Sequence, residues 1–349
     1  MSSRRPSWRV LAVTNMYPTP ATPAYGAFVA SQMASIAETG AGVEIDFIDG
    51  RRGMWQYALA VPRIRRLVRS GRFDLVHAHY GLAGWAAGAQ PLPLVVSFCG
   101  DDLLGTPGRD DHLTWKSRIG VRLSQAAAHR ADAIICKSES LRARLGAAAD
   151  RERAHVIPNG VDTRVFTPGS RAAARERLGL EQAERLILFP SSPEIRRKRH
   201  DLAEAAVRVF QEEGATARLW VLHGVVPEQM PDVYRAADCL IVTSDWEGSP
   251  NVVKEALCCD IPVVSVDVGD TRLWLERAQG SALVARDPAA IAAGLRAVLG
   301  GTTRVDGSAV RQAIDARGVA ARVLDVYAEA VARHRASRRA GDRGPHSRA

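Results

Sequence analysis

Short apolar runs alternate with longer amphipathic stretches along almost the whole chain, and this alternation restricts the fold more than any other feature of the sequence. A short apolar run bounded by turn residues is typical of a buried strand, and an amphipathic stretch is typical of a helix that covers it. The alternation therefore predicts parallel β-sheets covered by helices on both faces. The length of 349 residues, at roughly 150 residues per domain, predicts two such domains.

Two series of strands are expected, one in each half of the chain. The first series comprises the apolar runs at 10–15, 43–48, 74–79, 94–98, 133–137 and 154–157. The second series comprises 186–189, 217–222, 239–243, 262–266 and 282–284, with helices at about 199–213, 230–236, 251–259 and 288–299. Between the first strands, the stretch 55–69 is predicted to be a helix with Leu59 and Ile64 near one apolar face, weakened in its middle by Pro62.

The pattern loosens after Pro158-Asn159-Gly160, and a new helix begins near Arg171. We therefore place an N-terminal domain at 1–167 and a C-terminal domain at 168–311. An apolar helix follows within 312–336. The remainder, 337–349, is rich in Arg, Gly and Ser without apolar periodicity, and we expect it to be disordered.

Composition narrows the class of protein. No run of about eighteen apolar residues and no secretory leader is present, so we expect a cytoplasmic protein. The five cysteines lack C-x-x-C spacing, which argues against a disulfide framework and a zinc site. The formal net charge of +9 can indicate an anionic partner such as nucleic acid, a phosphorylated substrate or a membrane surface. A large share of the arginines lies in the tail 333–348, so we interpret this charge mainly as that of a solvated tail, and weak peripheral attachment to the inner face of a membrane is an open alternative. We expect no nucleic-acid partner.

The loop after the strand at 239–243 carries the most informative residues. Glu247 precedes a turn at Gly248 and Pro250, and Glu255 lies within the helix that begins near Asn251. Free backbone N–H groups at the start of this helix can bind an anion, and two carboxylates can accept hydrogen bonds from paired hydroxyls. Spacing alone leaves the alternative that Glu247 favours the helix dipole and Glu255 is an ordinary surface residue.

The same loop resembles a known family. Glu247 and Glu255 form an E-x7-E element within S-D-W-E-G-S-P-N-V-V-K-E-A-L, which is similar to the donor-binding motif of retaining glycosyltransferase family 4, a group with the GT-B fold. Further similar segments are I-P-N-G-V-D at 157–162, Y-R-A-A-D at 234–238 and, as in teichuronic-acid-type and capsule-type members, 16–18 with 25–29. The resemblance extends from about residue 10 to about residue 300. It implies two doubly wound Rossmann-like domains that face each other across a cleft.

The resemblance also implies roles for the residues of the donor site. Glu255 binds ribose hydroxyls and Glu247 contacts the transferred sugar. Backbone N–H groups near Asn251 and Val252, with Ser249 and Pro250 in the turn before them, hold the distal phosphate. Lys198 matches the family's phosphate-binding lysine, and Arg196 or Arg197 takes the place of its arginine. A cation beside the diphosphate stabilises the charge that develops as the sugar leaves, by about 3 kcal/mol.

In the N-terminal half, Gly26 either allows a phosphate or sugar to approach the backbone closely or simply forms a turn. Cys99 stands where many family members have a histidine. The residues considered for the acceptor side are His77, His79, Cys99 and Asp102, with Asp101 as a catalytic candidate. A packed or acceptor-side role is expected for the histidines rather than a metal site. We expect no metal and no cofactor.

The predicted activity is transfer of a sugar from a nucleoside-diphosphate sugar to an acceptor hydroxyl, with the retention that the resemblance implies. The acceptor is a saccharide, a lipid-linked saccharide or a small molecule, in polysaccharide, glycolipid or glycoside biosynthesis. Two alternatives remain: a nucleotide-sugar epimerase or phosphorylase of the same fold, and a non-catalytic sugar- or polyanion-binding protein.

Overall fold

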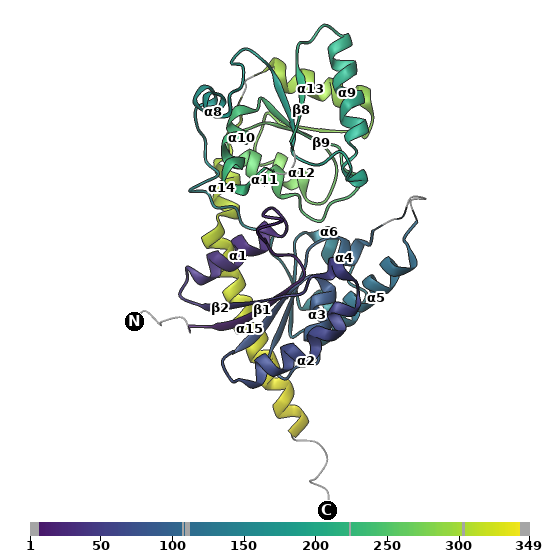
Figure 1. Cartoon of the computed structure of the whole chain (residues 1–349), viewed down its shortest axis with the longest axis vertical. Coiled ribbons are helices and arrows are strands. Elements are labelled where there is room, and N and C mark those ends of the chain that lie inside the picture. The colour runs from purple at the N-terminus through teal and green to yellow at the C-terminus, as the bar shows by residue number, and fades with distance from the viewer. Residues whose placement is uncertain (1–6, 107, 109–111, 223–224, 302–303, 343–349) are drawn as a thin grey trace, which may run out of the picture. The chain divides into compact units, whose positions relative to one another are not determined.

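The computed structural model describes residues 7–106, 108, 112–222, 225–301 and 304–342. The chain forms two compact units (Figure 1). The N-terminal unit comprises 1–18, 25–158 and 317–349, and the C-terminal unit comprises 19–24 and 159–316.

The N-terminal unit is built on a parallel sheet of order β2-β1-β3-β4-β5-β6. Its strands are β1 (Arg9–Thr14), β2 (Gly42–Phe47), β3 (Leu75–His79), β4 (Leu94–Phe98), β5 (Ala133–Cys136) and β6 (Ala154–Val156). Its helices are α1 (Ala27–Ala37), α2 (Trp55–Arg69), α3 (Gly81–Ala87), α4 (Asp101–Leu104), α5 (Trp115–Arg130), α6 (Glu139–Arg142) and α7 (Ala148–Glu152), with a 3-10 turn η1 (Gly50–Arg52). Each predicted strand of the first half is therefore confirmed.

Two apolar layers fill this unit because the strands are buried on both faces. Helices α2, α3 and α5 pack together over one face, where Ile64, Ala83 and Ala128 belong to one core. The other face is covered by α1 and by the long C-terminal helix α15 (Ala316–Asp342), through Ile36 and Val323. The near-continuous apolar character of the strands follows from this two-sided burial.

Helix α15 is tied to the N-terminal sheet by a buried polar contact as well as by packing. His77 on β3 hydrogen-bonds with the Tyr327 hydroxyl through Nδ1 at 2.7 Å and with Ser97 on β4 through Nε2 at 2.8 Å. All three side chains are fully buried. Burial lowers the pKa of His77 to about 3, so the imidazole is neutral at ordinary pH.

The C-terminal unit contains a parallel sheet of order β11-β10-β9-β7-β8. Its strands are β7 (Leu186–Phe189), β8 (Arg218–Val221), β9 (Cys239–Val242), β10 (Val263–Val266) and β11 (Ala282–Val284). Its helices are α8 (Arg171–Leu178), α9 (His200–Glu212), α10 (Met230–Ala236), α11 (Asn251–Cys258), α12 (Thr271–Leu275), α13 (Pro288–Gly300) and α14 (Ser308–Ile314), with 3-10 turns η2 (Arg196–Lys198) and η3 (Pro227–Gln229). The second series of predicted strands is also confirmed.

The boundary between the units differs from the predicted one. The chain changes unit between Pro158 and Asn159, earlier than 167–168. The reason is a long-range contact: the Val161 N–H donates to the Ile314 carbonyl, and the Ala316 N–H donates to the Val161 carbonyl, both at 2.9 Å. These bonds hold the segment after Pro158 within the C-terminal unit.

The C-terminal region also departs from the prediction. The expected single helix within 312–336 is divided between α14 and α15 by Asp315, whose extended backbone ends α14 and whose Oδ1 accepts a hydrogen bond from Thr163 at 2.6 Å. Helix α15 then continues to Asp342, so residues 337–342 of the predicted disordered tail are helical. Residues 343–349 lie outside the described residues.

Helix α2 corrects two details of the sequence interpretation. It runs without interruption through Pro62. Leu59, expected on the apolar face with Ile64, is 59% exposed, whereas Tyr57, Ala60, Ile64 and Val68 are buried. Within the described part of the chain, no helix has the length and apolar character needed to cross a membrane.

In the C-terminal unit, a buried ion pair joins α8 to Asp238, the residue that precedes β9. Arg175 is 0% exposed, and its guanidinium contacts the Asp238 carboxylate at 2.8 Å and donates to the carbonyls of Ala236 and Glu184. Asp238 also accepts from the Leu186 N–H of β7 at 2.7 Å. The charges are matched inside the protein, so removal of one would leave the other unpaired.

We predict that Asp238→Asn lowers the free energy of unfolding of the C-terminal unit by about 3–5 kcal/mol, because the Arg175 charge stays buried without its partner. Urea denaturation measures this change. The matched control is Arg177→Ala, which removes the solvent-exposed pair with Asp232 and should cost less than about 1 kcal/mol. Equal losses in the two variants would contradict the prediction.

A second prediction concerns acid stability. The pKa of His77 is about 3 in the folded state and about 6.5 when unfolded, so only the unfolded chain gains a proton between these values. The contribution of His77 therefore makes stability fall by about 1.4 kcal/mol per pH unit as pH drops below about 6.5. In His77→Gln the decline should be shallower, while the exposed control His112→Gln should keep the wild-type slope. Unfolding free energies measured across this range check the difference, and an unchanged slope in His77→Gln would contradict it.

Candidate functional site

The strand order of the C-terminal unit brings two loops together. Strand β7 lies between β8 and β9, so the chain reverses its direction of winding between β7 and β9. Loops at the carboxyl ends of such a strand pair diverge and form a ligand-binding crevice. Here the loop after β7 and the loop after β9 are joined by hydrogen bonds: the Asp245 N–H donates to the Arg197 carbonyl at 2.8 Å, and the Thr243 hydroxyl donates to the Lys198 carbonyl at 2.8 Å.

Glu247 meets two cations at this junction. Its carboxylate lies 2.6 Å from Lys198 Nζ and 2.9 Å from Arg197, and it accepts a hydrogen bond from the Ser244 hydroxyl at 2.9 Å. Burial raises the pKa of Glu247, but the charges of Lys198 and Arg197 outweigh that effect and lower its pKa overall. The carboxylate is therefore ionised, and the two cations are held at the carboxyl edge of the sheet.

The neighbouring basic residues separate into different roles. Arg196 is exposed, and Arg197 rather than Arg196 takes the position beside Glu247. Arg199 has a φ of 53°, in the left-handed region, and its guanidinium pairs with Asp245 at 3.1 Å and with Asp201 at 2.9 Å. Arg199 thus stabilises the loop and leaves Arg197 and Lys198 near the predicted site.

Glu255 lies on α11, on the helix that follows the Glu247 loop. The Tyr234 hydroxyl of α10 donates to Glu255 Oε2 at 2.8 Å. Burial raises the pKa of Glu255. The hydroxyl of Tyr234 is thus the partner of Glu255 in this contact, whereas the partners of Glu247 include two cations. The two predicted glutamates thus occupy different electrostatic surroundings.

Lys254, which the sequence interpretation missed, is fully buried beneath the turn. Its Nζ donates to the Ser249 hydroxyl at 3.0 Å and to the Asn159 carbonyl at 3.4 Å. Ser249 in turn donates to Asp270 at 2.8 Å, and Asp270 and Lys254 interact electrostatically. A signal was present: Lys254 shares the buried face of α11 with Val253, Ala256 and Leu257.

The start of α11 is shaped by the chain around it. Pro250 precedes the helix and offers no side-chain cap, and Asn251 Oδ1 accepts from Asn159 Nδ2 at 3.2 Å. Asn251 and Val252 are half-buried. Gly269 has a φ of +60°, and a Cβ there would lie 3.1 Å from the carbonyls of Glu247 and Gly248. The loop after β10 therefore packs against the turn and supports it.

In the N-terminal unit, Gly26 serves the conformation of its own loop. Its φ is +73°, and a Cβ would come within 2.3–2.5 Å of backbone atoms of Met16 and Tyr17. Any other residue would clash with the chain at this point. Gly26 therefore allows the backbone at the start of α1 to lie close to the backbone of Met16 and Tyr17.

The predicted histidines lie inside the sheet. His77 makes the contacts with Tyr327 and Ser97 described above. His79 is also fully buried, with its ring 4.2 Å from that of His77, centroid to centroid. Burial lowers the pKa of His79, so it too is neutral. His77 is a packed histidine that joins β3, β4 and α15. Within the described residues, no group of three or more His, Cys, Asp or Glu side chains is arranged to hold a metal ion.

The loop after β4 is organised by Asp102. Its buried carboxylate accepts hydrogen bonds from the N–H groups of Gly81, Cys99 and Gly100 at 2.8–3.1 Å. Burial raises the pKa of Asp102 to about 6 and the pKa of the Cys99 thiol to about 12. Cys99 is consequently a neutral thiol, and Asp102 holds the loop rather than projecting a free carboxylate.

Asp101 borders a cavity of about 260 Å³ within the N-terminal unit. The cavity is lined by residues of α4, of α5 and of the segment between them, together with Tyr80 and Leu82 at the start of α3. Its polar members include Asp101, Asp102, Thr106, Thr114, Lys116, Ser117 and Ser124. The cavity can offer several donors and acceptors to a polyhydroxylated molecule.

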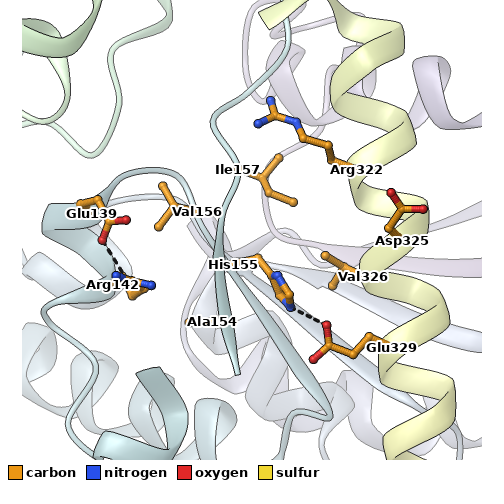
Figure 2. Close-up of a pocket in the computed structure, with 10 residues that line it drawn as sticks. All are labelled: Glu139, Arg142, Ala154, His155, Val156, Ile157, Arg322, Asp325, Val326 and Glu329. Carbon is orange, nitrogen blue, oxygen red and sulfur yellow. Dashed lines mark ion pairs between the residues drawn. The ribbon is translucent and has the colours of Figure 1, made fainter. Parts of the chain in front are cut away.

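A larger hollow of about 550 Å³ lies where β6 meets α15 (Figure 2). The ionisable side chains that line it are partly paired with one another: Arg142 lies 2.9 Å from Glu139, and His155 lies 2.9 Å from Glu329. Figure 2 shows the second pair spanning from the strand to the helix. None of the predicted site residues lines this hollow.

Residues 8–165 match the model of Glycosyltransferase Family 4, and residues 181–300 match that of Glycosyl transferases group 1. A D-inositol 3-phosphate glycosyltransferase of Xylanimonas cellulosilytica is 32% identical over 75% of this chain and 73% of its own length. Another protein of that name, from Geodermatophilus obscurus, is 29% identical over 70% of this chain, which spans 63% of the relative's length.

Solved structures show the same fold. A sucrose-phosphate synthase from Thermosynechococcus elongatus aligns with a TM-score of 0.76 at 17% identity, over 93% of this chain and 99% of its own. HepE of Anabaena, solved in complex with UDP and glucose, aligns with a TM-score of 0.66 at 16% identity, over 92% of this chain and 99% of its own. The fold is therefore GT-B, with two parallel-sheet α/β units. The two family models and the relative that is 32% identical show that the chain belongs to glycosyltransferase family 4.

Proposed function

We propose that this glycosyltransferase takes a sugar from a nucleoside-diphosphate sugar bound at the carboxyl edge of β7 and β9, and transfers it to an acceptor hydroxyl with retention of configuration. The observation that carries the proposal is the contact of Glu247 with Lys198 and Arg197. It places an ionised hydrogen-bond acceptor and two cations within one small site. A sugar diphosphate requires both kinds of group.

In the proposed donor complex, each of these residues has a separate role. Lys198 and Arg197 bind the diphosphate and stabilise the charge that grows on it as the sugar departs, each by about 3 kcal/mol. Glu247 accepts hydrogen bonds from hydroxyls of the sugar. The N–H groups at Asn251 and Val252 face the distal phosphate at the helix N-terminus, and Glu255 binds the ribose hydroxyls.

No separate nucleophile is needed in this scheme. The leaving phosphate takes the proton of the acceptor hydroxyl, so that positioning and electrostatic stabilisation supply the catalysis. We propose that the reaction requires no metal, because Lys198 and Arg197 supply the positive charge beside the diphosphate.

On the acceptor side, we propose that Asp101 orients the reactive hydroxyl. The cavity beside it is lined with hydroxyls and with Lys116, and a polyhydroxylated acceptor would find hydrogen-bond partners there. The relatives named as D-inositol 3-phosphate glycosyltransferases suggest a cyclitol phosphate as the first acceptor to test. A saccharide or a lipid-linked saccharide belongs in the same panel.

The donor is tested by thermal unfolding with UDP-, GDP- and ADP-sugars, because a ligand that binds the folded state raises Tm. Transfer is then followed with the stabilising donor and the acceptor panel. Product with the anomeric configuration of the donor supports the proposal. Isomerised donor without acceptor would identify an epimerase, and dependence on free phosphate would identify a phosphorylase.

We predict that Glu247→Gln lowers kcat by about 100-fold or more, since it removes the charged acceptor at the sugar. Binding of the nucleoside diphosphate alone should be retained or strengthened, because the amide no longer neutralises Lys198 and Arg197. Steady-state kinetics and calorimetry measure the two effects. The contrasting variant Lys198→Ala should weaken diphosphate binding. Wild-type turnover in Glu247→Gln would exclude Glu247 from the site.

Lys254 is predicted to be a positioning residue for the Ser249–Pro250 turn. Lys254→Met should lower Tm, because Asp270 loses a nearby cation, and should also raise the KM for the donor. The double variant Lys254→Met/Asp270→Asn should recover part of the Tm, since no charge is left unpaired, but not the KM. Recovery of both quantities together would indicate a purely structural role.

A further inference from the structure

The loop after β2 leads into an exposed indole that is held in place. Trp55, the first residue of α2, is 57% exposed. Its Nε1–H donates to the Arg52 carbonyl at 3.1 Å, and a Cβ at Gly53 would lie 2.9 Å from the indole atoms Cδ1 and Nε1. Gly53 also has a φ of +125°, which disfavours any residue with a side chain. The indole is therefore fixed against the loop while much of its surface is open to solvent.

An exposed aromatic side chain by itself is ordinary on a protein surface. Trp115, at the start of α5, is 67% exposed, and within the described residues its indole N–H has no hydrogen-bond acceptor. Trp55 differs because its orientation is set before any ligand arrives. Ordering a side chain on binding costs affinity, so an indole that is already ordered is suited to a binding site.

The loop that supports Trp55 is anchored to the carboxyl end of β1. Asn15, which follows β1, donates from Nδ2 to the Tyr57 hydroxyl at 2.9 Å, and its carbonyl accepts from the Tyr25 hydroxyl at 3.1 Å. Gly50 lies against Tyr57, since a Cβ there would be 2.3 Å from the hydroxyl oxygen. The Arg51 guanidinium lies over the Tyr25 ring, 4.7 Å from its centroid. These contacts make the loop a fixed part of the carboxyl edge, where ligands bind in open parallel sheets.

The same loop carries polar groups that suit hydroxyls. Asp49 pairs with Arg51 at 2.7 Å and with Arg52 at 3.5 Å, and both arginines are exposed. The hydrogen bond from Arg51 lowers the pKa of Asp49, so its carboxylate is an ionised acceptor. Asn15 Oδ1 is buried and has no hydrogen-bond partner within the described part of the chain. A buried acceptor without a donor is costly, which favours a ligand that supplies one.

We propose that Trp55 is a stacking platform for a sugar ring of the acceptor and that the acceptor is an oligosaccharide, a conclusion that rests on the proposed transfer to an acceptor hydroxyl. A pyranose with equatorial hydroxyls presents axial C–H bonds on its faces, and these apolar faces pack on an aromatic ring. The hydroxyls at its rim then bind donors and acceptors such as Arg52 and Asp49.

The order of the strands supports an acceptor longer than one sugar. Trp55 follows β2, whereas Asp101, proposed to orient the reactive hydroxyl, follows β4. In the sheet these strands are separated by β1 and β3. Neighbouring strands lie about 4.8 Å apart, so three spacings separate the two loops by roughly 14 Å. A single sugar ring is shorter than this distance, whereas an oligosaccharide reaches from the reactive hydroxyl to the indole.

The experiment measures saccharide binding to the full chain without donor, by calorimetry and ligand-observed NMR. The probes are cellotriose, chitotriose and maltotriose, whose rings carry equatorial hydroxyls, with glucose as the single-ring comparison. The variants are Trp55→Ser, Trp55→Phe and Gly53→Ala, the last of which keeps the indole but obstructs its position. The matched control, Trp115→Ser, removes an exposed indole that lacks this support. Circular dichroism and the Tm shift with the donor show that each variant remains folded and retains its donor site.

The wild type and the control should bind at least one trisaccharide equally well, and more tightly than glucose. Trp55→Ser should weaken this binding by about tenfold, and Trp55→Phe by less, because the smaller ring keeps part of the contact. Gly53→Ala should also weaken it. The proposal is overturned if no trisaccharide binds, if Trp55→Ser binds as the wild type does, or if Trp115→Ser loses as much. It is also overturned if Trp55→Ser loses only partition into phosphatidylglycerol vesicles, which would assign the indole to a membrane surface.

Failure of the proposed transfer would be a separate result. If trisaccharide binding depends on Trp55 but no donor yields a product, the stacking site stands and the transferase activity does not. If product forms and the KM for an oligosaccharide acceptor is the same in Trp55→Ser as in the wild type, the activity stands and the stacking site is overturned.

Discussion

The contact between Glu247 and the cations Lys198 and Arg197 depends on one constraint, the reversal of strand order between β7 and β9. Residues 197 and 198 are far from 247 in sequence, and only adjacent parallel strands bring their loops to the same edge. The two loops are then held together by the Asp245 N–H, which donates to the Arg197 carbonyl, and by the Thr243 hydroxyl, which donates to the Lys198 carbonyl. An ionised carboxylate and two cations can share a half-buried site because each charge is balanced by its neighbours. The rest of the proposed donor site is arranged around this contact.

Much of the fold could be predicted, because burial of a parallel sheet on both faces leaves a strong local signal. Each strand of both units lies within a residue or two of an apolar run in the sequence. The boundary at Pro158 could not be predicted in the same way. It depends on hydrogen bonds between Val161 and the segment 314–316, which are far apart in the chain and leave no local pattern. The division of the last helix at Asp315 has a similar cause, a contact with Thr163.

The same difference between local patterns and long-range contacts applies to the site residues. Glu247 and Lys198 could be proposed from motif spacing, and the structure brings them together. The support beneath them was missed, because Lys254 and Asp270 are polar residues in buried positions, and only the three-dimensional contacts show that their charges offset each other. The prediction that Leu59 lies on the apolar face was wrong because it relied on the local helical pattern alone. Helical periodicity places it near the apolar stripe, but the core of this layer accepts Tyr57, Ala60, Ile64 and Val68 and leaves Leu59 in solvent.

The polar groups near the carboxyl edges of the two sheets differ in whether they are charged or neutral. In the C-terminal unit, Glu247 has a lowered pKa and faces two cations, so charged groups are retained there. In the N-terminal unit, burial keeps His77, His79 and the Cys99 thiol neutral. A diphosphate requires the paired cations that Lys198 and Arg197 provide, whereas a polyhydroxylated acceptor requires hydrogen-bond partners such as those that line the cavity beside Asp101. This difference supports the proposed assignment of donor to the C-terminal unit and acceptor to the N-terminal unit.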